Sequence, residues 1–131
     1  MAKTVMIVED NPLHMKLFTD ILEAQGYDTL RTADAESFLE LAREHHPDLI
    51  LLDVRLPFVS GLDLLARIKE ESDLKDIPVV AVTAAADEWE RDEYLNRGFA
   101  DFLPKPIAIP NFLRTVAEFI DPMPFAVSKS A

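Results

Sequence analysis

The 131-residue sequence contains no cysteine and only three glycines, at positions 26, 61 and 98. The lack of cysteine excludes disulfide bonds and thiolate metal sites, and it fits a reducing compartment. With so few glycines, the chain has no G-x-G-x-x-G or G-x-x-x-x-G-K-[ST] loop, and no G-x-S-x-G nucleophile elbow. The sequence therefore excludes these glycine-dependent nucleotide loops and serine hydrolase sites as the basis of its function.

The sequence also lacks a long apolar run. No stretch approaches the roughly 20 residues that a membrane-spanning helix needs. Residues 1–10 carry no apolar segment before a small-residue cleavage site, as a signal peptide would. We therefore expect a cytoplasmic protein without a membrane span.

Basic residues are scarce, because 13 lysines and arginines stand against 24 acids, which gives a net charge of -11. A chain this acidic disfavours nucleic acid and anionic membranes as direct partners. The same charge makes any local cluster of carboxylates costly, so such a cluster calls for a functional reason.

What the chain does contain is an alternation of strand-like and helix-like segments, with 49% hydrophobic residues for a core. The predicted strands are residues 4–9, 27–32, 48–53, 77–84 and 100–105. The predicted helices are residues 11–26, 34–46, 60–72, 87–98 and 109–120. This alternation predicts an α/β fold, a doubly wound sheet of five parallel strands covered by five helices. We expect one domain over residues 1–121 and a flexible tail over residues 122–131.

Polar residues stand where the predicted strands end. Glu9 and Asp10 follow the first strand, Asp53 ends the third, Thr83 lies near the end of the fourth and Lys105 ends the fifth. In a parallel sheet of this kind, ligands bind outside the carboxyl ends of the strands. These side chains are therefore expected to gather at one edge of the sheet.

Three neighbouring carboxylates repel one another, and a hard divalent cation relieves that repulsion. Mg²⁺ prefers one or two carboxylates together with water and phosphate oxygens. Lys105 adds a positive charge, and the Thr83 hydroxyl can donate a hydrogen bond to an incoming oxygen. The set suits phosphoryl transfer, in which a carboxylate such as Asp53 can be the nucleophile.

These residues stand in motifs that resemble those of the receiver domain of bacterial two-component response regulators. The motifs are IVEDN at residues 7–11, LLDVRLPFVSG at 51–61, VVAVTA at 79–84 and FLPKP at 102–106. They occur in the family's order and spacing, over nearly the whole chain. The resemblance implies a flavodoxin-like (βα)5 fold that works as a phosphoacceptor switch and not as an enzyme.

The resemblance also implies a role for each residue. Asp53 is expected to accept the phosphoryl group. Asp10 and Asp53 are expected to bind Mg²⁺ directly, with Glu9 acting through metal-bound water and the backbone carbonyl of Arg55 as a further ligand. Lys105 is expected to contact first Asp53 and then the phosphoryl group.

Two further expectations concern the switch and the backbone beside Lys105. Thr83 and the aromatic Phe102 are expected to form the switch, in which Thr83 turns inward and Phe102 follows. The bond between Lys105 and Pro106 is expected to be cis.

Some positions depart from the commonest family pattern or leave a choice open. Phe102 stands where tyrosine is usual, so no hydroxyl is available there. Arg55 stands at a position that sets phosphoryl lifetime, where it could shield the phosphoryl group from water. Tyr94 and Trp89 fit either partial burial in the core or an exposed binding patch.

A narrower likeness, to single-domain cell-cycle regulators, lies in residues 8–32 and 76–84. We therefore expect a stand-alone regulator, monomeric or weakly dimeric, with a possible role in cell-cycle control. Its donor would be a histidine kinase or phosphotransfer protein, and its output a protein partner that reads helix 87–98, strand 100–105 and helix 109–120. Two rival functions stay open: an unphosphorylated binding module, and a Mg²⁺-dependent phosphohydrolase.

Overall fold

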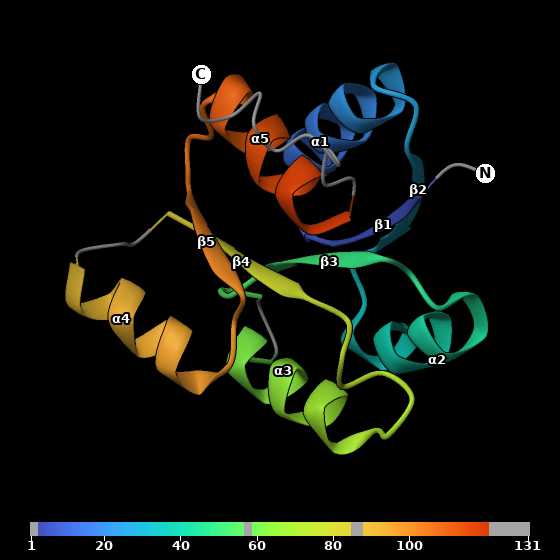
Figure 1. Ribbon diagram of the computed structural model, residues 1–131, viewed down its shortest axis with the longest axis vertical. Coiled ribbons are helices and arrows are strands. Elements are labelled where there is room, and N and C mark those ends of the chain that lie inside the picture. The colour runs from blue at the N-terminus through green and yellow to red at the C-terminus, as the bar shows by residue number, and fades with distance from the viewer. Residues whose placement is uncertain (1–2, 57–58, 85–87, 121–131) are drawn as a thin grey trace.

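The computed structural model describes residues 3–56, 59–84 and 88–120. Five parallel strands form one sheet in the order β2-β1-β3-β4-β5 (Figure 1). The strands are β1 Thr4–Val8, β2 Asp28–Thr32, β3 Leu49–Asp53, β4 Val79–Thr83 and β5 Asp101–Pro104. The helices are α1 Pro12–Ala24, α2 Ala35–His45, α3 Gly61–Glu70, α4 Glu88–Arg97 and α5 Ile109–Ile120. The predicted fold class is confirmed, while the predicted tail, residues 122–131, lies outside the described residues.

Helices cover both faces of the sheet. Figure 1 shows α1 and α5 on one face and α2, α3 and α4 on the other. Because side chains alternate along a strand, each central strand supplies both cores. In β3, Leu51 packs under α1 and α5, whereas Leu52 packs with α2, α3 and α4. Burial on both faces explains why β1, β3 and β4 are almost entirely apolar, whereas the edge strand β2 keeps exposed polar residues.

Local capping sets where the helices begin and end. The Asn11 side chain accepts from the backbone N–H groups of Leu13 and His14, and Pro12 occupies the first turn. Gly26, just beyond the end of α1, has a φ of +91°, which favours glycine. The capped start of α1 directs the chain away from the sheet immediately after the acidic residues.

The first strand ends one residue earlier than predicted. β1 stops at Val8, so Glu9 lies in the loop, although its N–H still donates to the carbonyl of Thr32 at 3.1 Å. This hydrogen bond uses only the backbone of Glu9, so its side chain is available to the residues at the end of β3. Within the described residues, the structure has no helix with the length and apolar character needed to cross a membrane.

Candidate functional site

Three carboxylates meet at the carboxyl ends of β1 and β3. Glu9 and Asp10 follow β1, and Asp53 is the last residue of β3, the adjacent strand. One carboxylate oxygen from each lies within 4.8 Å of the other two. Glu9 and Asp53 are buried, and Asp10 is exposed. The crevice beside the point where strand order reverses, between β1 and β3, is where folds of this type bind ligands.

Lys105, just after β5, supplies a positive charge to this cluster. Its Nζ donates to Oε1 of Glu9 at 2.8 Å and to Oδ2 of Asp53 at 3.3 Å. The ammonium therefore bridges two buried acids from different strands. The peptide bond between Lys105 and Pro106 is cis, the configuration that the resemblance implies.

The charges of the cluster are unbalanced. Burial raises the pKa of Glu9 above its ordinary value, and the charge of Asp53 acts in the same direction. The hydrogen bond and charge of Lys105, together with the N–H of Asn11, lower that pKa again without fully offsetting burial. Two buried carboxylates thus share one lysine, and a third carboxylate lies beside them. This arrangement favours binding of a further cation.

The Asp53 carboxylate is held from two sides. Its Oδ1 accepts from the backbone N–H of Arg55 at 2.9 Å, while Oδ2 faces Lys105. These two contacts fix the orientation of the carboxylate. A second hydrogen bond, from the N–H of Gly61 to the carbonyl of Val54 at 2.9 Å, closes the turn that carries Arg55.

Gly61 is a supporting residue that the sequence analysis did not single out. A Cβ at this position would lie 2.7 Å from the Cα of Val54 and 3.0 Å from the carbonyl oxygen of Asp53. The start of α3 therefore packs directly against the backbone of the acceptor strand. The serine and glycine pair at the start of α3 is the only sequence signal for this contact, and it is equally typical of an ordinary helix cap.

Thr83 and Phe102 lie beside this site on the neighbouring strands. Thr83 ends β4 and is fully buried, and its carbonyl accepts from the N–H of Lys105 at 2.9 Å. Phe102, in β5, is half-buried and stacks on Tyr94 of α4, with ring centroids 6.0 Å apart. The two predicted switch residues thus sit on adjacent strands, and Tyr94 packs beside them.

The side chain of Arg55 approaches helix α4. Its Nη2 lies 3.8 Å from Oε2 of Glu90 on α4, and 61% of the side chain is exposed. Its backbone carbonyl, the predicted metal ligand, belongs to the same turn as the N–H that holds Asp53. The open choice about Tyr94 is settled as well, because this residue is 8% exposed and belongs to a core. The side chain of Trp89 lies outside the described part of the chain.

The donor set fits Mg²⁺. Three carboxylates, one of them exposed, offer hard oxygen ligands at a rim that a phosphate group can reach. Within the described residues, Asp10 has no ion-pair or hydrogen-bond partner for its side chain. Glu9, Asp10 and Asp53 are the residues that would hold the ion.

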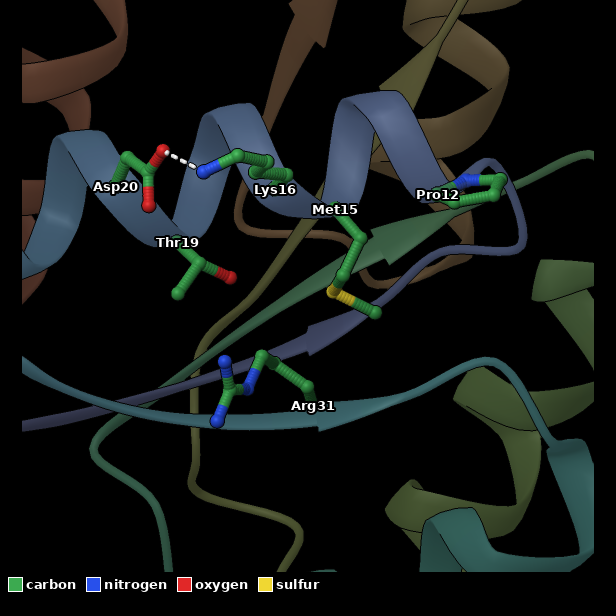
Figure 2. A pocket seen from close by; sticks show the side chains of 6 residues that line it. All are labelled: Pro12, Met15, Lys16, Thr19, Asp20 and Arg31. Atoms are coloured by element: carbon green, nitrogen blue, oxygen red, sulfur yellow. Dashed lines mark hydrogen bonds and ion pairs between the residues drawn. The ribbon is translucent and has the colours of Figure 1, made fainter.

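A separate hollow of about 320 Å³ lies between α1 and β2. Figure 2 shows it between Thr19 and Met15 of α1 and Arg31 of β2, with the ion pair of Lys16 and Asp20 at its border. None of the predicted site residues lines this hollow. The clustered acids and Lys105 are therefore the part of the described surface that matches the predicted chemistry.

Comparison with known proteins agrees with this geometry. The response regulator receiver domain family matches residues 5–117. The polar-differentiation response regulator DivK of Brucella ovis is 48% identical over 120 residues, which cover 92% of this chain and 98% of the relative. DivK of Brucella anthropi shows the same identity and coverage.

Solved structures give the same picture. The receiver domain of a sensor histidine kinase from Pseudomonas aeruginosa, described with a magnesium ion coordinated in its active site cleft, has a TM-score of 0.83 and 28% identity. A response regulator from Desulfuromonas acetoxidans has a TM-score of 0.84 and 25% identity. Each comparison covers 92% of this chain and 98% of the solved one. The chain belongs to the response regulator receiver domain family.

Proposed function

We propose that this protein is a stand-alone phosphoryl-receiving switch whose acceptor is Asp53. The observation that carries the proposal is the Lys105 ammonium bridging Glu9 and Asp53 beside a third carboxylate, Asp10. A purely structural strand end has no need for three acids and a half-buried lysine. Phosphorylation on aspartate with Mg²⁺ is general to the family to which the chain belongs.

The transfer moves a phosphoryl group from the nitrogen of a phosphohistidine, or from the oxygen of an acyl phosphate, to Asp53, which becomes an aspartyl-phosphate. An Oδ atom of Asp53 attacks phosphorus, the new O–P bond forms, and the bond from phosphorus to the donor nitrogen or oxygen breaks. The donor leaves with the electron pair of that bond. Oδ1 is held by the N–H of Arg55, so Oδ2, which faces Lys105, is the oxygen we assign to the attack.

The surrounding side chains neutralise and orient the phosphoryl group. Mg²⁺, when bound by Glu9, Asp10 and Asp53, offsets the negative charge of the carboxylates and of the phosphoryl oxygens. Lys105 then moves its contact from the Asp53 carboxylate to a phosphoryl oxygen. The Thr83 hydroxyl, at the end of the adjacent strand, donates to another of these oxygens.

The output follows from the added charge of roughly -2 at neutral pH. Thr83 turns toward that charge, Phe102 moves into the space, and the surface formed by α4, β5 and α5 changes. A protein partner reads this surface, and a histidine kinase or phosphotransfer protein supplies the phosphoryl group. By likeness to DivK, we assign the protein to the cytoplasm and to cell-cycle control, as a monomer or weak dimer.

The test is intact mass measured after incubation with acetyl phosphate and Mg²⁺. One phosphoryl adduct is expected on the wild type, with none on Asp53→Asn and none after chelation of the metal. Asp101→Asn, at a half-buried acid in β5 outside the cluster, serves as the matched control and should keep the adduct.

The rival functions predict different results. Continuous release of phosphate from an external ester, without an adduct on Asp53, would indicate a phosphohydrolase. A folded protein that forms no adduct, even with a phosphohistidine protein as donor, would indicate an unphosphorylated binding module. Either result would overturn the proposal.

A further inference from the structure

Helix α4 is attached to the rest of the molecule through Tyr94. Among the α4 side chains that the structure describes, residues 90–97, only Tyr94 is buried. Its ring stacks on Phe102 at 6.0 Å with an interplanar angle of 20°, and meets Phe99 edge-on at 6.0 Å. Among the described side chains of α4, Tyr94 therefore makes the main contact with the core.

The Tyr94 hydroxyl reaches into the switch region. It forms side-chain hydrogen bonds with Glu90, one turn earlier in α4, and with Thr83 at the end of β4. Burial raises the pKa of the phenol most, and the charge and hydrogen bond of Glu90 also raise it, whereas the charge of Arg55 and the hydrogen bond with Thr83 lower it. Because an ionised carboxylate can only accept, the phenol donates to Glu90, and its oxygen can accept from the Thr83 hydroxyl.

Glu90 extends this connection to the acceptor loop. Its Oε2 lies 3.8 Å from Nη2 of Arg55, and the backbone N–H of Arg55 donates to Asp53 at 2.9 Å. Thr83, Tyr94, Glu90 and Arg55 thus form a chain of polar contacts that runs from the end of β4, the strand paired with β3, to the loop that follows Asp53. Both ends of the chain are groups able to donate a hydrogen bond to an anion.

We propose that Tyr94 is a positioning residue that latches α4 to the unphosphorylated site, and that phosphorylation of Asp53 opens the latch by drawing Thr83 and Arg55 away. The proposal rests on the proposed function, since it takes Asp53 as the acceptor. It adds a residue of α4 to the switch and assigns Arg55 a partner before phosphorylation.

The strengths of the contacts favour opening. Thr83 and Tyr94 share a hydrogen bond between neutral groups, whereas a hydrogen bond to a phosphoryl oxygen is charge-assisted and roughly twice as strong. The Arg55 contact with Glu90 is long, and the arginine is mostly exposed, so this ion pair is weak. A new dianionic group beside both ends therefore outcompetes both contacts.

The latch also accounts for Phe102. With phenylalanine in β5, the ring beside Thr83 has no hydroxyl, and the hydroxyl that meets Thr83 comes from α4 instead. The stacked pair of rings places that hydroxyl and the Phe102 ring on the same side of the switch. Movement of Thr83 is thereby transmitted to the helix itself, and not only to β5.

The test compares amide hydrogen exchange of α4 in Tyr94→Phe and in wild type, with and without acetyl phosphate and Mg²⁺. Tyr94→Phe keeps the stacked ring and removes only the hydroxyl. Tyr27→Phe, at the other tyrosine of the chain, is the matched control. Intact mass, recorded on the same samples, reports phosphorylation of Asp53 independently of α4.

We expect exchange in α4 to be about fivefold faster in unphosphorylated Tyr94→Phe than in wild type, the loss expected for one hydrogen bond. The phosphorylated proteins should exchange alike, so phosphorylation should change α4 much less in the variant. The control should behave as wild type. Glu90→Gln removes the negative charge that Tyr94 and Arg55 contact, and it should shift exchange in the same direction.

Four results would overturn the latch. A normal adduct with identical α4 exchange in wild type and Tyr94→Phe in both states shows that the hydroxyl does not hold the helix. Faster exchange by the same factor in both states shows a purely structural contact. Absence of the adduct on wild type refutes the proposed function, and with it the trigger of the latch, whereas an adduct without a change in α4 refutes the latch alone.

Discussion

Lys105 and Glu9, 96 residues apart in the sequence, form an ion pair with 2.8 Å between Nζ and Oε1. The Glu9 side chain is 1% exposed and the Lys105 side chain 13%. Burial is the main cause that raises the pKa of Glu9, and the hydrogen bond from Lys105 is the main cause that lowers it. The lysine therefore limits the free-energy cost of keeping this carboxylate ionised before any metal binds.

Lys105→Met is expected to raise the pKa of Glu9 further in the metal-free protein. The pKa in the folded protein already lies above the ordinary value of 4.5. Such a carboxyl contributes stability that is full below about pH 4.5 and is lost as pH rises through the folded pKa. The substitution extends that loss to higher pH. Carbon-13 NMR titration of the Glu9 carboxyl measures the shift, with the exposed Lys75→Met as control; equal pKa values in both variants would contradict it.

Asp10→Asn is expected to stabilise the metal-free protein and to weaken Mg²⁺ binding. Because Asp10 is exposed, removing its repulsion toward the other two acids gains about 1 kcal/mol or less. Loss of a ligand should weaken Mg²⁺ binding by at least about tenfold, the lower end of what outer-shell changes cause. Thermal unfolding and calorimetric titration with Mg²⁺ measure the two effects. Asp76→Asn removes the same charge at an exposed turn before β4 and should leave Mg²⁺ affinity unchanged.

Gly61→Ala is expected to destabilise the protein by about 1–3 kcal/mol, the usual cost of overpacking. Alanine would otherwise favour a helix, but here its methyl group lies 2.7 Å from the Cα of Val54, a backbone atom that cannot swing aside. The displaced backbone also carries Asp53, so phosphorylation by acetyl phosphate should slow. Ser60→Ala removes the adjacent helix cap and should lower stability by a similar amount while leaving the phosphorylation rate near wild type.

Phe112→Ala is expected to lower the free energy of unfolding by about 3–5 kcal/mol. Phe112 of α5 is fully buried and stacks on Phe18 of α1 at 5.4 Å, beneath both helices. Urea denaturation measures the loss. Phe119→Ala, on the same helix at a half-buried position, should cost clearly less; equal losses would show that the packing between α1 and α5 does not depend on the stacked pair.

The sequence allowed the strand ends to be predicted because chain order and strand polarity alone determine which edge they share. Glu9, Asp53 and Lys105 could be placed together once the segments were recognised as parallel strands. The same reasoning predicts a cation site, since three acids at one edge of the sheet need a counter-charge. No contact between particular side chains was needed for either step.

Tyr94, Gly61 and the contact between Arg55 and Glu90 could not be found in this way. Helix α4 is strongly polar, so its pattern does not indicate which face packs on the sheet, and Tyr94 fitted the core and the surface equally well. The need for glycine at position 61 arises from the distance to Val54, which no local pattern encodes. Contacts between loops and helices depend on packing, which sequence periodicity does not report.

The even apolar character of β3 has a consequence for how Asp53 is kept in register. Residues 49–52 are all large aliphatic residues, and they are buried on both faces of the sheet. A slip by one position would exchange leucine and isoleucine between the two cores, so its cost lies at the two ends of the run, where Asp48 or Asp53 would enter a buried position. The four aliphatic residues therefore ensure that β3 is buried, and the acids on either side of them oppose a change of register. Two hydrogen bonds beyond the strand hold this end in place, from the N–H of Arg55 to Oδ1 of Asp53 and from the N–H of Gly61 to the carbonyl of Val54, so the position of the acceptor depends on the following turn as well as on the core.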